Sequence, residues 1–144
     1  MIVVADASVL VAELLRRRGR ALLRHPYLSV VVAEDQWEET EHELARRLDI
    51  LSSRAGLSNE RRQDLDGAIR ALIEDKVVEV APRESYAGFR ATALHRVPRD
   101  ERDWPTVALA ITLDAAILTA DNDFLGCGCP TWTVETLSSE LGIP

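Results

Sequence analysis

The chain has 144 residues, enough to bury a substantial core, and we expect a single domain spanning residues 1–144. Its hydrophobic fraction of 47% and charged fraction of 28% are typical of soluble globular proteins, and no apolar run approaches the roughly 20 residues that a membrane helix needs. The net charge of −7 argues against tight nonspecific nucleic-acid binding through overall charge, although the metal-binding acids of a nuclease would themselves add negative charge.

The N-terminal residues lack the basic start and small-residue cleavage site of a signal peptide, which favours a cytoplasmic protein without membrane contact. Cys127 and Cys129 are too few for a disulfide framework. They could be half of a metal site, but the sequence offers no second cysteine pair and no histidine at ligand spacing. Small, easily buried residues in a turn are therefore the preferred interpretation of this pair.

Short apolar runs alternate with amphipathic segments along the chain. Residues 2–5 are apolar throughout, as in strands buried on both faces of a parallel sheet. In chain order we expect a strand at 2–5, a helix at 8–18, a strand at 28–33, helices at 35–52 and 59–73, a strand at 77–80, a helix at 84–95, a buried helix opening at Asp103, strands at 115–119 and 131–134, and a helix at 135–141. Strands that alternate with helices predict an α/β fold, with three layers in the order α/β/α and a mostly parallel central sheet.

Side chains at the ends of these segments predict where helices begin and end. Ser8 and Ser58 are N-cap candidates, and Asp35 with Glu38 has the spacing of a capping box. Pro98 should end the helix that precedes it.

Acidic residues follow two of the predicted strands. Asp6 comes directly after the first strand, and Asp121 and Asp123 arrive as the strand of residues 115–119 ends. In an open α/β sheet, ligands collect at the carboxyl ends of strands. If the two strands are neighbours, they lie ~4.8 Å apart, and carboxylates at that spacing repel each other unless a cation lies between them. Together with Asp103 they predict a site for Mg²⁺ or Mn²⁺, which prefer hard oxygen ligands.

Each of these acids also has a purely structural interpretation. Asp6 and Asp121 could be turn residues or helix caps, and Asp103 could cap the helix that it opens. Asp123 is a metal ligand, an acid just outside the ligand set, or a turn residue.

A further carboxylate should come from the acidic first half of the helix at 35–52. Glu43 ranks first because it lies at the edge of the apolar stripe that includes Leu44 and Leu48. Glu39 ranks second and Glu41 third. For each of the three, a carboxylate that is simply solvated on the helix surface stays an open alternative.

Two stretches of the chain, VVADASVLV near the start and RDWPTVALAITLDAAILTADNDF near the end, are similar to the motifs of PIN-domain ribonucleases. This is the fold of VapC-type toxins of bacterial toxin–antitoxin pairs. The first stretch resembles the family's strand, Asp and short turn, with Ser8 where many members have Asn. The second resembles its Asp, apolar helix, strand and T-x-D-x-D-F ending.

The resemblance implies a Mg²⁺- or Mn²⁺-dependent endoribonuclease whose metal-binding and catalytic residues are Asp6, Asp103, Asp121 and one helix glutamate, Glu43 or alternatively Glu39. Asp123 matches a more variable acid of the family. The implied partners are an RNA substrate and an antitoxin protein, and we also expect a homodimer. The alternative function is a PIN-like module that binds RNA or a protein with little or no cleavage.

Overall fold

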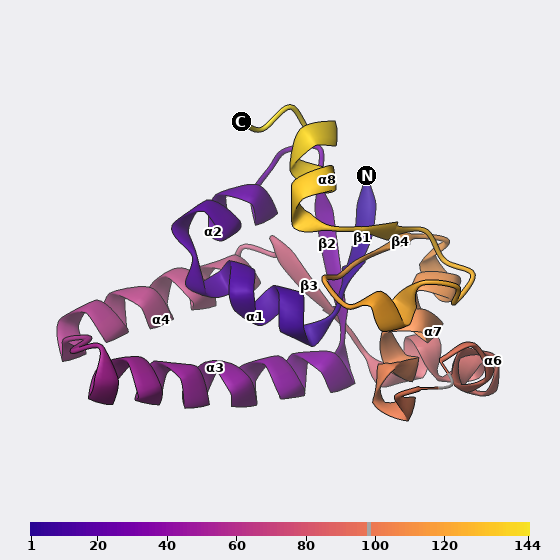
Figure 1. Ribbon diagram of the computed structural model, residues 1–144, viewed down its shortest axis with the longest axis horizontal. Helices are drawn as coiled ribbons and strands as arrows, with labels where there is room; N and C mark the ends of the chain where they lie inside the picture. The colour runs from indigo at the N-terminus through magenta and orange to yellow at the C-terminus, as the bar shows by residue number, and fades with distance from the viewer. Residues whose placement is uncertain (98) are drawn as a thin grey trace.

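Five parallel strands form the central sheet in the computed structural model, which describes residues 1–97 and 99–144 (Figure 1). The strands are β1 (Ile2–Ala5), β2 (Ser29–Ala33), β3 (Val78–Ala81), β4 (Ala116–Leu118) and β5 (Thr131–Trp132). Their order across the sheet is β3-β2-β1-β4-β5, and every neighbouring pair runs parallel. The strand β1 is central, between β2 and β4, which explains why its sequence is apolar throughout.

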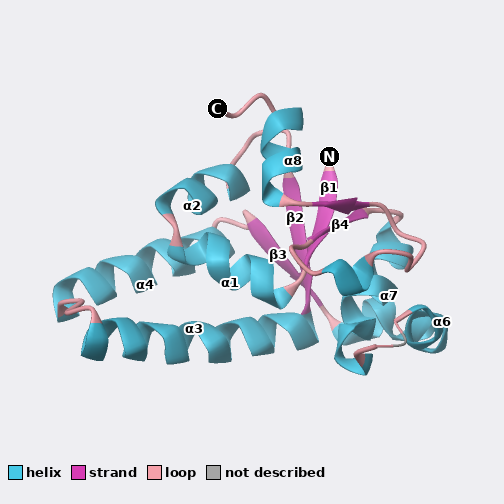
Figure 2. Cartoon of the chain, in the orientation of Figure 1, coloured by secondary structure: helices cyan, strands magenta, loops and turns pink. Residues whose placement is uncertain are grey.

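Helices cover both faces of the sheet, so the predicted three-layer α/β/α fold is confirmed (Figure 2). One face carries α1 (Ala7–Leu15), α2 (Arg17–Leu23), α3 (Glu34–Arg54), α4 (Asn59–Glu74) and α8 (Val134–Glu140). The other carries α5 (Arg83–Tyr86), α6 (Arg90–Arg96) and α7 (Trp104–Leu113). Short 3-10 helices complete the described elements: η1 (Ala87–Phe89), η2 (Glu101–Asp103) and η3 (Asn122–Phe124).

The hydrophobic core is divided into two parts by the sheet. Val3 and Ala5 of β1 pack in the part beneath α1 and α4, whereas Val4 packs in the part beneath α7. This alternation follows from the pleat of a strand, which turns successive side chains to opposite faces. The two parts together bury Val3, Val4 and Ala5 completely, so Asp6 directly follows the buried end of β1.

The first helix differs from its prediction at both ends. Asp6, not Ser8, is the N-cap residue of α1, because its carboxylate accepts a hydrogen bond from the Val9 N–H. Arg16 then takes an extended conformation and ends the helix, and α2, which was not predicted, follows. Gly19 lets α2 approach α1 closely, since a Cβ there would collide with the backbone oxygen of Glu13. A close contact of this kind leaves no periodic pattern in the sequence.

The predicted capping box of α3 is wrong. The N-cap residue is Ala33, and the carboxylate of Asp35 is bound by Arg83 and Tyr86 instead. For α4 the prediction is confirmed, because the hydroxyl of Ser58 accepts a hydrogen bond from the Arg61 N–H.

The segment predicted as one helix over residues 84–95 is divided into α5, η1 and α6. The predicted helix end at Pro98 lies outside the described residues. Among the helices that the structure describes, none is long and apolar enough to cross a membrane.

Candidate metal-binding and catalytic site

The carboxyl ends of β1 and β4 lie side by side. Ala5 is in register with Leu118, and the Asp6 N–H donates to the Leu118 carbonyl at 3.2 Å. The two strands are thus neighbours, as the expected pairing of their acids required. Asp6 and Asp121 are consequently placed at one edge of the sheet.

The carboxylate of Asp6 is buried, and both of its oxygens accept hydrogen bonds. Its Oδ1 accepts from the Val9 N–H at 2.8 Å and from the Ser8 hydroxyl at 3.1 Å, and its Oδ2 accepts from the Thr119 hydroxyl. Burial raises the pKa of Asp6, an effect that these hydrogen bonds oppose and the nearby charge of Asp121 increases. Asp6 therefore caps α1 and also faces the acids at the end of β4.

Thr119 connects the two strand-end acids. Its hydroxyl donates to Asp6 and accepts from the Asp121 N–H at 2.9 Å, and its side chain is buried. The sequence motif contains this threonine, but we assigned it no role. A weak signal was present, because a threonine hydroxyl can accept a hydrogen bond from the backbone N–H two residues farther on and so form a local turn.

Asp103 stands at the N-cap position of α7, yet its side chain does not cap that helix. One carboxylate oxygen from each of Asp103, Asp121 and Asp123 lies within 4.8 Å of the others. Burial, together with the negative charges of Asp100, Asp121, Asp6 and Asp123, raises the pKa of Asp103 to about 7. The capping alternative is therefore wrong for Asp103, and its carboxylate is left facing other carboxylates.

The two acids after β4 have different surroundings. The carboxylate of Asp121 accepts a hydrogen bond from the Asp123 N–H at 2.8 Å, which shapes the turn of η3. Asp123 forms an ion pair with Arg99 at 3.1 Å. Asp123 thus combines the turn role with a place in the acidic group, and its charge is partly balanced by an arginine.

A cleft of about 150 Å³ opens where these segments meet. Residues of α1, α3 and η2, together with the acids that directly precede α1, η2 and η3, line it: Asp6, Ala7, Ser8, Gln36, Glu39, Asp100, Arg102, Asp103 and Asp121. Of the three candidate glutamates of α3, Glu39 lines this cleft. Glu41 instead lines a groove between α3 and α4.

Glu43 is committed to other partners. It forms ion pairs with Arg46 at 2.6 Å and Arg47 at 3.2 Å, and these arginines lower the pKa of Glu43 to about 2. It also lies one helical turn, ~6 Å, farther along α3 than Glu39. Glu39, which the sequence ranked second, therefore lines the cleft, and Glu43, which it ranked first, does not.

Most of the charged side chains that line the cleft are carboxylates, and most of these form no ion pair among the described residues. Arg102 pairs with Asp100 at 3.1 Å, so this arginine neutralises an acid at the rim. No ion pair within residues 1–97 and 99–144 involves Asp6, Asp103 or Asp121. An all-oxygen donor set with excess negative charge fits a hard divalent cation such as Mg²⁺ or Mn²⁺.

Solved structures share this fold. The crystal structure of PAE2754 from Pyrobaculum aerophilum is 18% identical with a TM-score of 0.61, covering 99% of this chain and 98% of that one. FitAB bound to an IR36 DNA fragment is 15% identical with a TM-score of 0.58, covering 92% and 94%. FitAcB from Neisseria gonorrhoeae is 20% identical with a TM-score of 0.52, covering 92% and 96%.

Comparison of the sequence with curated proteins finds no match. The family model described as "PIN domain" matches residues 4–142, nearly the whole chain. It spans every element that contributes a side chain to the cleft. The chain belongs to the PIN domain family.

Proposed function

We propose that this protein is a Mg²⁺- or Mn²⁺-dependent endoribonuclease, acting as the toxin of a toxin–antitoxin pair. The observation that carries the proposal is the group of Asp103, Asp121 and Asp123, whose carboxylate oxygens lie within 4.8 Å of one another beside the buried Asp6. Such a group is unfavourable in a partly desolvated cleft unless a cation balances it. Membership of the PIN family supports nuclease chemistry at this place.

We assign the metal-ligand role to Asp6, Asp103, Asp121 and Glu39, in place of Glu43, with Asp123 as a further acid nearby. When bound, the cation would activate a water molecule and stabilise negative charge on the phosphate oxygens. The protein's own contribution is to hold these carboxylates rigidly. Asp103 must be ionised to act as a ligand, so we expect metal binding to strengthen as pH rises through about 7.

The choice of RNA depends on the family resemblance, because this chemistry does not need the 2′-hydroxyl group. Arg99 and Arg102 are each paired with an acid, so a phosphate group would have to compete with Asp123 and Asp100 for them.

A protein partner is part of the same proposal, and the similarity of fold to FitAB and FitAcB supports it. A partner's arginine could bridge two of the cleft carboxylates and would then compete with the cation. Titrating a cognate partner at several Mn²⁺ concentrations tests this, and affinity that is independent of Mn²⁺ would contradict it. A homodimer and a cytoplasmic location complete the proposal, and sedimentation and cell fractionation test them.

The test of the nuclease activity uses single-stranded RNA and DNA of the same sequence, with Mn²⁺, Mg²⁺ or a chelator. We expect metal-dependent cleavage of RNA that the chelator and the Asp103→Asn substitution both abolish. The matched control is Asp64→Asn, which neutralises an exposed carboxylate on α4 and should leave cleavage unchanged.

Calorimetric measurement of Mn²⁺ binding, combined with the cleavage assay, separates the nuclease from a binding module. Cleavage that survives Asp103→Asn or the chelator would contradict the proposed site. Binding of Mn²⁺ without cleavage of any RNA would favour the PIN-like binding module instead.

A further inference from the structure

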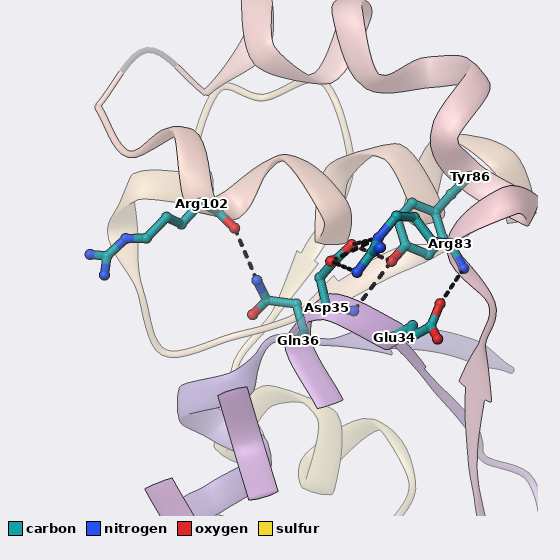
Figure 3. A network of polar contacts seen from close by, with 6 residues as sticks. All are labelled: Glu34, Asp35, Gln36, Arg83, Tyr86 and Arg102. Atoms are coloured by element: carbon teal, nitrogen blue, oxygen red, sulfur yellow. Dashed lines mark hydrogen bonds and ion pairs between the residues drawn. The ribbon is translucent and has the colours of Figure 1, made fainter. Parts of the chain in front are cut away.

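We propose that Gln36 is the positioning residue of the acidic cleft, holding the segment after Asp6 and the segment before Asp103 at a fixed separation. Figure 3 shows its amide extending from the start of α3 toward the backbone of Arg102. The part that concerns metal binding rests on the proposed function, whereas the positioning itself is tested independently below.

The amide of Gln36 joins two segments that are far apart in sequence. Its Oε1 accepts a hydrogen bond from the Ala7 N–H at 3.2 Å, and its Nε2 donates to the Arg102 carbonyl at 3.0 Å. An N–H can only donate and a carbonyl can only accept, so both backbone partners require the same orientation of the amide. The side chain is 5% exposed, and water therefore competes little for these bonds.

Both backbone partners lie next to proposed metal ligands. Ala7 directly follows Asp6, and Arg102 directly precedes Asp103. A shift of either segment would move one carboxylate relative to the other. Since metal affinity depends on how well ligands are preorganised, the bridge made by Gln36 should affect binding without touching the cation.

The start of α3 is itself anchored, which makes Gln36 a rigid bridge. Asp35 accepts from the Arg83 guanidinium at 2.9 Å and from the Tyr86 hydroxyl at 2.7 Å. Glu34 accepts from the Arg83 N–H at 2.8 Å. Figure 3 shows these contacts on the side of the turn away from Arg102, so the helix start is held from two directions.

The decisive variant is Gln36→Met, which keeps the length of the side chain but removes both hydrogen bonds. Its matched control is Thr40→Val, one turn along α3, which removes a buried hydroxyl that donates only to the Gln36 carbonyl at 2.7 Å. Gln36→Met should weaken Mn²⁺ binding about tenfold, the lower end of the loss seen when an outer-shell partner of a metal site is removed. Thr40→Val should leave Mn²⁺ affinity unchanged, and equal affinities in both variants would overturn the proposal.

Amide hydrogen exchange without metal tests the positioning separately. In Gln36→Met, exchange should quicken at Ala7 and at Asp103, whose N–H donates to the Asp100 carbonyl in the same turn as Arg102. Unchanged exchange at both amides would overturn the proposal even if the protein binds Mn²⁺. Absence of Mn²⁺ binding by the unmodified protein would instead contradict the proposed function and leave the exchange result to decide on Gln36.

A second variant serves if Gln36→Met does not fold. Gln36→Glu keeps an acceptor for the Ala7 N–H, but an ionised carboxylate cannot donate to Arg102. Exchange should then quicken at Asp103 while Ala7 stays protected. Loss of protection at Ala7 alone would contradict the assigned hydrogen bonds.

Discussion

Thr119→Val should destabilise the protein more than the loss of an ordinary hydroxyl, because this one hydroxyl serves two acid-bearing segments. It donates to the buried carboxylate of Asp6 and accepts from the Asp121 N–H. Valine has nearly the same shape, so the change removes hydrogen bonds without creating a large cavity. The oxygen of Asp6 would then be buried without this partner, whereas Asp121 is exposed and its N–H can bond to water instead.

The expected cost follows from the two bonds that are lost. A hydrogen bond to a charged group contributes ~1.5–3 kcal/mol and one between neutral groups ~1 kcal/mol, so the free energy of unfolding should fall by about 2.5–4 kcal/mol. The hydrogen bond from Thr119 also lowers the pKa of Asp6, and its loss should raise that pKa further. The cost should therefore be largest at high pH, where Asp6 is ionised, and should shrink as pH falls and Asp6 takes up a proton.

Urea unfolding without metal, repeated between pH 5 and 8, measures this cost. The control is Thr112→Val, whose hydroxyl donates to the Ala108 carbonyl at 2.8 Å within α7 and serves no second segment. It should cost less than Thr119→Val at every pH. Equal costs for the two variants, or a Thr119→Val cost that grows as pH falls, would refute the proposed link between Asp6 and Asp121.

Three further predictions concern the acids themselves. Asp6→Asn and Asp121→Asn should each abolish metal-dependent RNA cleavage, and full activity in either variant would reject the site; Asp121→Asn should also preserve or raise the metal-free melting temperature because it removes one of several repelling carboxylates, whereas Asp6→Asn also loses an oxygen that accepts from Ser8 and Val9 or from Thr119. Glu39→Gln should lower the cleavage rate at least about 100-fold, because the loss of a direct ligand should equal or exceed the roughly 10- to 100-fold loss seen for outer-shell partners, whereas the Glu43→Gln variant should cleave RNA normally; kinetics on the pair decides between them, and the opposite result would restore Glu43 as the ligand. The pKa of Asp103 is raised from the ordinary 3.8 of an aspartate to about 7, which favours the protonated folded state, so the contribution of Asp103 to metal-free stability should be complete below pH 3.8 and lost as pH rises through about 7; comparison with Asp103→Asn across this range isolates this contribution, and parallel stability curves would contradict the shift.

The sheet and the edge that carries the acids could be predicted because both depend on local patterns. An apolar run such as residues 2–5 marks a strand buried on both faces, and an acid directly after it must lie at the strand's carboxyl end. The same reasoning places Asp121 after β4. Which strands are neighbours is a matter of topology, and the parallel pairing of β1 with β4 supplied that step.

The helix acid could not be chosen from the sequence because the choice depends on tertiary partners. Periodicity places Glu39 and Glu43 on the same side of α3, one turn apart. The structure distinguishes the two glutamates. Because the helix starts at Glu34, Glu39 reaches the cleft, whereas Glu43 is paired with two arginines on the surface. Gln36 was missed for a related reason, because a lone glutamine carries no charge pattern.

The first turn of α3 shows why helix caps there cannot be predicted from residue type and spacing alone. Asp35 has the residue type and spacing of a helix cap, yet its carboxylate binds Arg83 and Tyr86, and the helix begins at Glu34 without a side-chain cap. Asp103 likewise occupies a capping position without capping α7. A capping bond would typically contribute about 1 kcal/mol at each helix. Asp35 instead binds side chains of another segment, and Asp103 instead faces other carboxylates. The start of α3 is therefore held by contacts between segments, whereas at α1 the cleft acid Asp6 is itself the helix cap.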